Sequence, residues 1–347
     1  MSTTPSLQCN DCNTKLTRDW FGLRKAKSSC TNCEKNLCAK CAGAQALIPH
    51  HNIIDADPPP MVKSSIQSYC KSCYEEVSIL DYTKTYDIVE PTDDDDENQN
   101  ITLIWVHGGG GSRAMFRPHA RTLANQGYRS ILIDLPGHGT LADTTLTLDS
   151  CTETVQQILE KECMNCKKVI YIGGSLGAYI GFYILGQLKD RFAGAILIDC
   201  GQNVGPDCSL KARVGLWFLN KMSGHMSNKA LMGALMGAVS KSKADYHLVE
   251  CCFSAGMHFK QGPAQCMCLH SVAPAEYIPT YDFPILFFNG SEDYRDSERK
   301  WLNLCNDKER SDLKVFEGGD HFFCHDTRFV DDMLQRMDTF IQATSSS

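Results

Sequence analysis

From about Tyr82 to the end of the chain, short apolar runs alternate with stretches of helical periodicity. This alternation restricts the fold more than any other feature of the sequence. The apolar runs are rich in Ile, Leu and Val, as in strands that are buried on both faces. We expect strands at 101–106, 130–134, 169–173, 195–199, 284–289 and 313–316, and helices near 114–125, 151–162, 177–189 and 326–343. The pattern predicts a doubly wound, mostly parallel α/β sheet.

The first 80 residues differ from the rest in cysteine content and in charge. Eight of the 19 cysteines lie there, and the net charge is +2, against −9 for the remainder. A length of 347 residues also favours two domains. We therefore predict a small cysteine-rich domain at 1–78 and a large domain at 79–347. The acidic run 93–97 lies between strand-like segments at 85–89 and 101–106, so we interpret it as a solvated hairpin turn inside the large domain.

The cysteines of the small domain form four CxxC pairs, and four thiolates satisfy tetrahedral zinc. A single pair would leave a redox role open, but four pairs in 65 residues favour metal. Eight ligands predict two structural zinc ions with no free position for catalysis. The predicted ligands are Cys9, Cys12, Cys30, Cys33, Cys38, Cys41, Cys70 and Cys73.

The spacing of the middle two pairs, CxxC–x4–CxxC with one pair before and one after, resembles the FYVE family of phosphoinositide-binding fingers. The resemblance covers roughly residues 5–78. It implies a cross-brace, in which pairs one and three share one zinc and pairs two and four share the other. Most of the family's headgroup motif is absent: no W-x-x-D precedes Cys9, and Ser28 and Ser29 stand where the family has two histidines.

An apolar tip beside a basic patch remains in this region: Trp20, Phe21 and Leu23 with Arg24, Lys25 and Lys27. Each cation near an anionic leaflet contributes about 1 kcal/mol. The tip therefore predicts contact with an anionic or phosphoinositide membrane surface. The alternative is that its apolar side chains form the core of the small finger.

The uncharged window 169–188 is long enough to be considered as a membrane span. It holds five glycines and a serine, so we interpret it as a strand, a sharp turn and a buried helix, and expect no transmembrane segment. The amino terminus, MSTTPSLQCNDC, has no apolar stretch, so we expect no secretory signal. A cytoplasmic protein, peripheral on endomembranes through its finger and without a nucleic-acid partner, is the expected context.

The motif that carries chemistry is Gly173-Gly174-Ser175-Leu176-Gly177, between an expected strand and an expected helix. This G-x-S-x-G is the pattern of a nucleophile elbow, in which a serine lies on a strained turn that only small neighbours allow. The start of the following helix favours a developing anion. The segment therefore predicts a nucleophilic serine at Ser175.

Further motifs follow in the chain order of the α/β-hydrolases, which the sequence resembles over about residues 82–343. They are His107 with the four glycines 108–111, the segment 134–139, the loop 290–293 and the loop 318–322. The resemblance implies a triad of Ser175, Asp293 and His321, with Asp199 as the alternative acid. It also implies an oxyanion hole from the backbone N–H groups of Leu176 and of Gly109 or a neighbouring glycine. His107 and His138 are interpreted as structural.

About 80 residues, 202–280, lack strand alternation where this superfamily inserts a helical cap. Their Met and aromatic content favours an acyl or lipid ligand or, as the alternative, packing of the cap on the core. The sequence as a whole predicts a serine hydrolase that cleaves small-molecule or lipid esters without a catalytic cofactor. The alternative is a zinc-finger adaptor or ligand receptor whose hydrolase domain binds without turnover.

Overall fold

The computed structural model describes residues 83–91, 100–225, 241–244, 249, 262–293 and 296–345. It also describes the backbone of two antiparallel strand pairs, β1 (Ser28–Ser29) with β2 (Asn36–Leu37) and β3 (Ala44–Leu47) with β4 (Ile66–Tyr69). The eight predicted zinc ligands and the predicted membrane tip, residues 20–27, lie outside the described residues.

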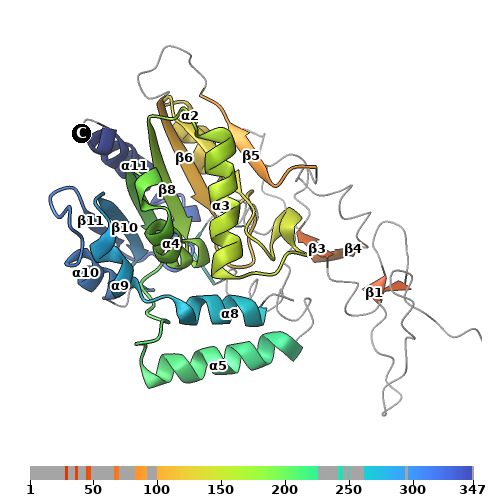
Figure 1. The fold of residues 1–347 in the computed structure, drawn as a ribbon. Coiled ribbons are helices and arrows are strands. Elements are labelled where there is room, and N and C mark those ends of the chain that lie inside the picture. Colours follow the sequence, from red (N-terminus) through yellow and green to blue (C-terminus); the bar gives the residue numbers. More distant parts are fainter. Residues whose placement is uncertain are drawn as a thin grey trace, which may run out of the picture.

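The large sheet has seven strands in the order β11-β10-β9-β8-β6-β7-β5, and all neighbours are parallel except β5 and β7. Each predicted strand is present within one residue at either end, so the sheet is a mixed α/β sheet as expected (Figure 1). The strands are β5 (Tyr86–Val89), β6 (Ile101–Val106), β7 (Arg129–Ile133), β8 (Lys168–Gly174), β9 (Gly194–Ile198), β10 (Ile285–Gly290) and β11 (Asp312–Phe316).

The prediction of a hairpin around the acidic run 93–97 is wrong. Strand β5 belongs to the sheet, but it pairs with β7, with Tyr86 opposite Ile133, and β7 separates it from β6. The chain between β5 and β6 therefore joins strands that are not neighbours. Both segments have strand character, but their local patterns do not reveal that a later strand comes between them.

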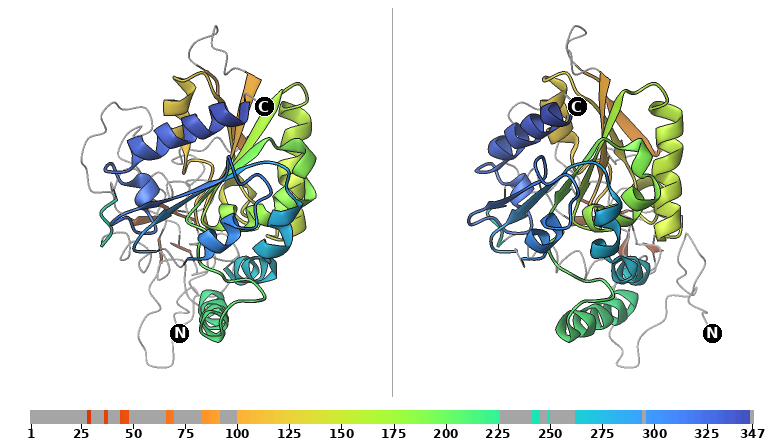
Figure 2. Two further views of the ribbon diagram at one scale, coloured as in Figure 1. Left: turned by 90° about the vertical axis from the view of Figure 1, so that its left-hand side faces the viewer. Right: turned by 60° about the vertical axis from the view of Figure 1, so that its left-hand side comes forward.

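Helices cover both faces of the sheet (Figures 1 and 2). Successive side chains of β6 point to opposite faces, so Ile104 and Val106 join one core and Leu103 and Trp105 the other. The first core is closed by α3 (Leu148–Glu162) and α4 (Leu176–Gln187), and the second by α2 (Arg117–Ala124) and α11 (Val330–Ser345).

The uncharged window 169–188 forms β8, a turn and α4, as predicted. Helix α4 is apolar on nearly every side and largely buried, because the sheet and α3 enclose it. None of the described helices is both long and apolar enough to cross a bilayer.

Between β9 and β10, the described chain forms three α-helices: α5 (Leu210–His225), α8 (Gly262–Ser271) and α9 (Pro274–Tyr277). Helix α8 contacts both α4 and α5, and the views place α5 on its outer side (Figures 1 and 2). A further described α-helix, α10 (Ser297–Leu302), precedes β11. The extent of the predicted cap, 202–280, stays a prediction.

Candidate active site

The elbow predicted from the sequence places Ser175 between the end of β8 and the start of α4, with φ 49° and ψ −109°. This strained conformation depends on small neighbours. A Cβ on Gly177 would lie 2.5 Å from the Val106 carbonyl oxygen, and one on Gly173 would lie 2.7 Å from the Ala178 nitrogen. The glycines allow the turn to press against the end of β6, which leaves the serine hydroxyl at the sheet's carboxyl edge.

Two loops bring a histidine and an aspartate to this serine. His321 follows β11, and its Nε2 lies 3.0 Å from Ser175 Oγ. Asp293 follows β10, and its Oδ2 lies 2.7 Å from His321 Nδ1. An ionised carboxylate only accepts hydrogen bonds, so His321 Nδ1–H donates to Asp293, and in the neutral ring Nε2 accepts from the serine hydroxyl. The structure therefore connects all three predicted triad residues in one chain of hydrogen bonds.

Gln202 is a further contact that the sequence did not indicate. Its Nε2 donates to Asp293 Oδ1 at 2.7 Å, so the two carboxylate oxygens have different partners. This contact fixes the plane of the carboxylate toward the imidazole. The two residues are 91 positions apart, and no local pattern marks an exposed glutamine as a partner of an acid.

The electrostatic surroundings favour the charged form of His321. Burial by itself would lower the pKa of His321, but the hydrogen bond to Asp293 and the negative charges of Asp199 and Asp293 raise it to about 9. The side chain is still 40% exposed. An imidazolium formed when the ring accepts a proton is thus stabilised in place.

Asp199, the alternative acid, lies behind the triad at the end of β9. Its side chain is buried and has polar atoms within 4.8 Å of those of Asp293 and His321. Its carboxylate accepts the Gly290 N–H at 3.4 Å, whereas the imidazole hydrogen bond goes to Asp293. Burial raises the pKa of Asp199 well above its usual value. The geometry thus pairs the imidazole with Asp293 and leaves Asp199 as a second, buried carboxyl group.

Asp199, Asp293 and His321 also form the one group within the described residues that has the spacing of a metal site. His321 uses Nδ1 for Asp293 and Nε2 for Ser175. Because both ring nitrogens are engaged, the arrangement is that of an acid–base set and not of a metal centre.

The glycine loop after β6 lies directly against the nucleophile. A Cβ on Gly108 would lie 3.3 Å from the Ser175 Cβ. The Gly108 N–H already donates to Met115 Sδ at 3.2 Å, and the Gly111 N–H donates to the Gly108 carbonyl at 3.1 Å. Within the part of the chain that the structure describes, the Gly109 N–H makes no such bond, which makes it the better candidate donor for an oxyanion.

The second predicted donor, the N–H of Leu176, is at the first position of α4. The first N–H groups of a helix have no partner inside the helix, and its dipole favours negative charge there. Gln265 of α8 lies over the same loop, since a Cβ on Gly109 would lie 2.2 Å from Gln265 Nε2. No sequence pattern indicated that this amide would lie at the site.

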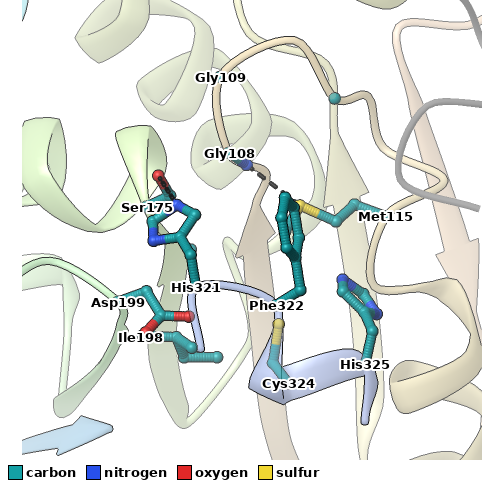
Figure 3. A pocket seen from close by; sticks show the side chains of 12 residues that line it. Gly108, Gly109, Met115, Ser175, Ile198, Asp199, His321, Phe322, Cys324 and His325 are labelled. Carbon is teal, nitrogen blue, oxygen red and sulfur yellow. Dashed lines mark hydrogen bonds between the residues drawn. The ribbon is translucent and has the colours of Figure 1, made fainter. Parts of the chain in front are cut away.

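A cavity of about 100 Å³ opens beside Ser175. Figure 3 shows that Met115, Phe322, Cys324 and His325 form the side opposite Ser175 and His321. Burial lowers the pKa of His325 well below its usual value, so this ring is neutral. The space is mainly apolar, with the reacting groups at one side. Its lining is Gly108, Gly109, Gly111, Met115, Gly174, Ser175, Ile198, Asp199, His321, Phe322, Cys324 and His325.

His107 and His138 are outside this cavity, in agreement with the structural role that the sequence indicated. His107 Nε2 accepts the Leu135 N–H at 3.0 Å, and its Nδ1 lies 2.7 Å from the Gly108 carbonyl. Burial lowers the pKa of His107 to about 4 and that of His138 to about 3. The neutral His107 ring ties the glycine loop to the loop that follows β7.

Comparison with known proteins supports the fold. A model of the alpha/beta hydrolase fold family matches residues 101–224. Over 104 residues, the chain is 32% identical to 2-succinyl-6-hydroxy-2,4-cyclohexadiene-1-carboxylate synthase from Yersinia pseudotuberculosis serotype O:1b. This match covers 30% of the chain and 36% of that protein, so it spans about a third of the relative's length.

Solved structures are similar over a larger part of the chain. MenH from S. aureus has a TM-score of 0.62 at 17% identity, covering 76% of this chain and 99% of that one. An esterase from Exiguobacterium antarcticum has a TM-score of 0.60 at 14% identity, covering 74% and 94%. The enol-lactonase from Burkholderia xenovorans LB400 has a TM-score of 0.58 at 16% identity, covering 74% and 95%. The chain therefore has the α/β-hydrolase fold.

Proposed function

We propose that this protein is a serine hydrolase that cleaves carboxylic esters. One observation carries the proposal: Ser175 Oγ, His321 and Asp293 form a continuous hydrogen-bonded chain, with distances of 3.0 and 2.7 Å, at the edge of an apolar cavity. A nucleophile, a base within its reach and a group that orients the base are the components of covalent acyl transfer.

In the proposed reaction, Ser175 Oγ attacks the ester carbonyl while His321 Nε2 accepts the hydroxyl proton. Asp293 holds the ring and stabilises the imidazolium. The N–H groups of Gly109 and Leu176 stabilise the tetrahedral oxyanion. His321 then donates its proton to the departing alcohol, which leaves an acyl-serine. Water, deprotonated by His321, releases the acid and restores the enzyme.

The cavity argues for a short acyl group. It is smaller than the roughly 150 Å³ space that accommodates benzene in an engineered protein core, and Met115, Ile198 and Phe322 make it apolar. A series of p-nitrophenyl esters of increasing acyl length tests this. We expect the highest kcat/KM for acetate to butyrate and a fall for longer chains, with hydrolysis of every ester strongly reduced in Ser175→Ala.

The alternative hypothesis from the sequence is an adaptor or ligand receptor, in which the hydrolase domain binds a ligand without turnover. It would leave all esters intact while a short acyl ligand still protects the protein from thermal unfolding. Turnover that depends on Ser175 would exclude it.

We also propose that the amino-terminal region binds two zinc ions through its eight cysteines and has no part in the ester chemistry. Eight thiolates form two complete tetrahedral sites. Elemental analysis should find two zinc per chain, and Cys38→Ser should lose about one. A chelator should leave hydrolysis of a water-soluble ester unchanged. Loss of activity in proportion to zinc would contradict this separation of roles.

A further inference from the structure

Helix α5 has a large apolar face that is exposed. Among its described side chains, Ala212, Leu216 and Asn220 are half-buried, and because they follow one another at intervals of four positions they lie on one side of the helix. Four large apolar side chains lie on the other side of the helix, and their exposed fractions are high: Leu210 75%, Val214 56%, Trp217 62% and Phe218 57%.

These four residues form one surface, because positions i, i+4, i+7 and i+8 share a helix face. We call it the α5 face. It contains four of the six exposed large hydrophobic side chains among the described residues. A concentration of this kind on one element indicates an interaction surface, whereas isolated exposed hydrophobic residues are common.

Helix α5 carries a positive charge in a protein whose net charge is −7. From residue 208 to residue 244 the chain has no Asp or Glu and six basic residues: Lys211, Arg213, Lys221, Lys229, Lys241 and Lys243. The first three belong to α5, and none of them is in an ion pair with a described residue. Arg213 donates to the Pro206 carbonyl at 3.2 Å.

We propose that α5 is a membrane-docking helix that binds an anionic lipid surface. Leu210, Val214, Trp217 and Phe218 insert among the acyl chains, and Lys211 and Lys221 contact the lipid headgroups. A helix with aromatic and aliphatic residues on one face and cations beside them binds in the plane of the bilayer interface in this way. The positive charge selects an anionic leaflet over a neutral one.

The position of α5 connects this surface to the candidate active site. Helix α8 contacts α5, and Gln265 of α8 lies over Gly109 of the glycine loop. Docking through α5 therefore turns the carboxyl edge of the sheet toward the membrane. The consequence for catalysis, a raised local concentration of membrane-borne ester, rests on the proposed function, but the docking itself does not.

Flotation of the full chain with vesicles measures the docking without any substrate. We compare phosphatidylcholine vesicles with vesicles that also contain phosphatidylserine. The wild type should bind the anionic vesicles, and binding should weaken between about 0.1 and 1 M salt, as the Debye length falls from about 10 to 3 Å. Trp217→Ser/Phe218→Ser should bind at least about tenfold more weakly, since two apolar side chains are lost from the interface.

Two matched variants keep the test decisive. Met164→Ser removes a side chain that is 77% exposed at the opposite edge of the sheet, just before β8, and should bind like the wild type. Lys211→Gln/Lys221→Gln keeps the apolar face and should lose mainly the preference for anionic vesicles. Thermal unfolding shows whether each variant is folded.

Unchanged vesicle binding by folded Trp217→Ser/Phe218→Ser would overturn the proposal, even if the cysteine-rich region binds lipid by itself. Equal binding to neutral and anionic vesicles would overturn the choice of an anionic surface. Wild-type dimers that this variant abolishes, without vesicle binding, would show that a second copy of the chain covers the α5 face instead.

Discussion

Two groups of histidine and aspartate lie at the carboxyl edge of the same sheet and have opposite properties. In the first, His321 is 40% exposed, lies beside Ser175 and bonds Asp293. In the second, His107 and His138 are buried, with rings 4.9 Å apart. The Asp293 bond and nearby carboxylates raise the pKa of His321 to about 9, whereas burial lowers that of His107 to about 4.

The second group is saturated by contacts within the fold. Asp134 accepts from the Arg113 backbone and guanidinium and from Thr140. His107 bridges the Gly108 carbonyl and the Leu135 N–H. The comparison shows that strand-end position and residue type do not define a catalytic group. A histidine becomes a base for chemistry when one nitrogen faces a carboxylate and the other faces a nucleophile beside a cavity.

The largest expected effect is a loss of activity when a residue of the first group is substituted. Ser175→Ala or His321→Ala should lower kcat by roughly 10⁴–10⁶, because the members of a triad act as a unit. The fold should remain, since neither side chain belongs to the hydrophobic core. Ester hydrolysis with a matched circular dichroism spectrum and Tm measures both. A His321→Ala variant that retains a tenth of the activity would contradict the assignment of the base.

A second prediction concerns which carboxylate serves the imidazole. Asp293→Asn should lower kcat by about 10⁴, because it disrupts the tautomer that presents Nε2 to the serine. Asp199→Asn should lower kcat far less, since the hydrogen bond that orients the imidazole comes from Asp293 and not from Asp199. Steady-state kinetics of both variants provides the comparison. If Asp199→Asn were the more damaging, the acid would have to be reassigned.

The third prediction concerns the second group, the buried residues around His107 and Asp134. A substitution there should change the stability of the fold and not the activity. Arg113 is fully buried and pairs with Asp134 at 2.7 Å and with Asp87 at 3.1 Å. Asp134→Asn removes the buried partner and should lower the free energy of unfolding by about 3 kcal/mol, the lower end for a broken buried pair, because Asp87 remains. Denaturant titration measures this. Per folded molecule, kcat should be unchanged, and a large loss would show that the group contributes to chemistry.

The smallest expected effect is a shift in the pH profile. The proposed base works as the neutral imidazole, so kcat/KM should rise with pH through a midpoint near the His321 pKa of about 9. Asp199 is one of the negative charges that raise this pKa. Asp199→Asn should therefore move the midpoint downward, by about one pH unit or less. A midpoint that stays in place would show that Asp199 is uncharged while the histidine titrates.

Much of the fold could be predicted because the strands are buried on both faces and so form uninterrupted apolar runs. Strand β6 shows this, with every residue from Ile101 to Val106 buried. The elbow could also be predicted, because its conformation requires glycine at Gly173 and Gly177, where there is no room for a side chain. The order of the sheet was less accessible: β5 pairs with β7, a strand that the chain reaches only after β6 and α2.

The site could be predicted where a residue follows a strand and missed where it does not. Asp293 lies in the loop after β10 and His321 in the loop after β11. Because these strands are parallel, both loops lie at the carboxyl edge of the sheet. Gln202 and Gln265 reach the site from the chain between β9 and β10, and glutamines in such a segment have no distinguishing pattern. Their roles depend on tertiary contacts alone.

The central claim is that Ser175 is made nucleophilic by His321. A fluorophosphonate probe tests it directly, because the probe forms a covalent bond only with an activated serine. Intact-mass and peptide analysis of the full chain should show one adduct, on Ser175, with a labelling rate that rises with pH as His321 loses its proton. Ser175→Ala and His321→Ala should not label, whereas Asp134→Asn should. A folded wild type that stays unlabelled, or a His321→Ala variant that labels at the wild-type rate, would contradict the account.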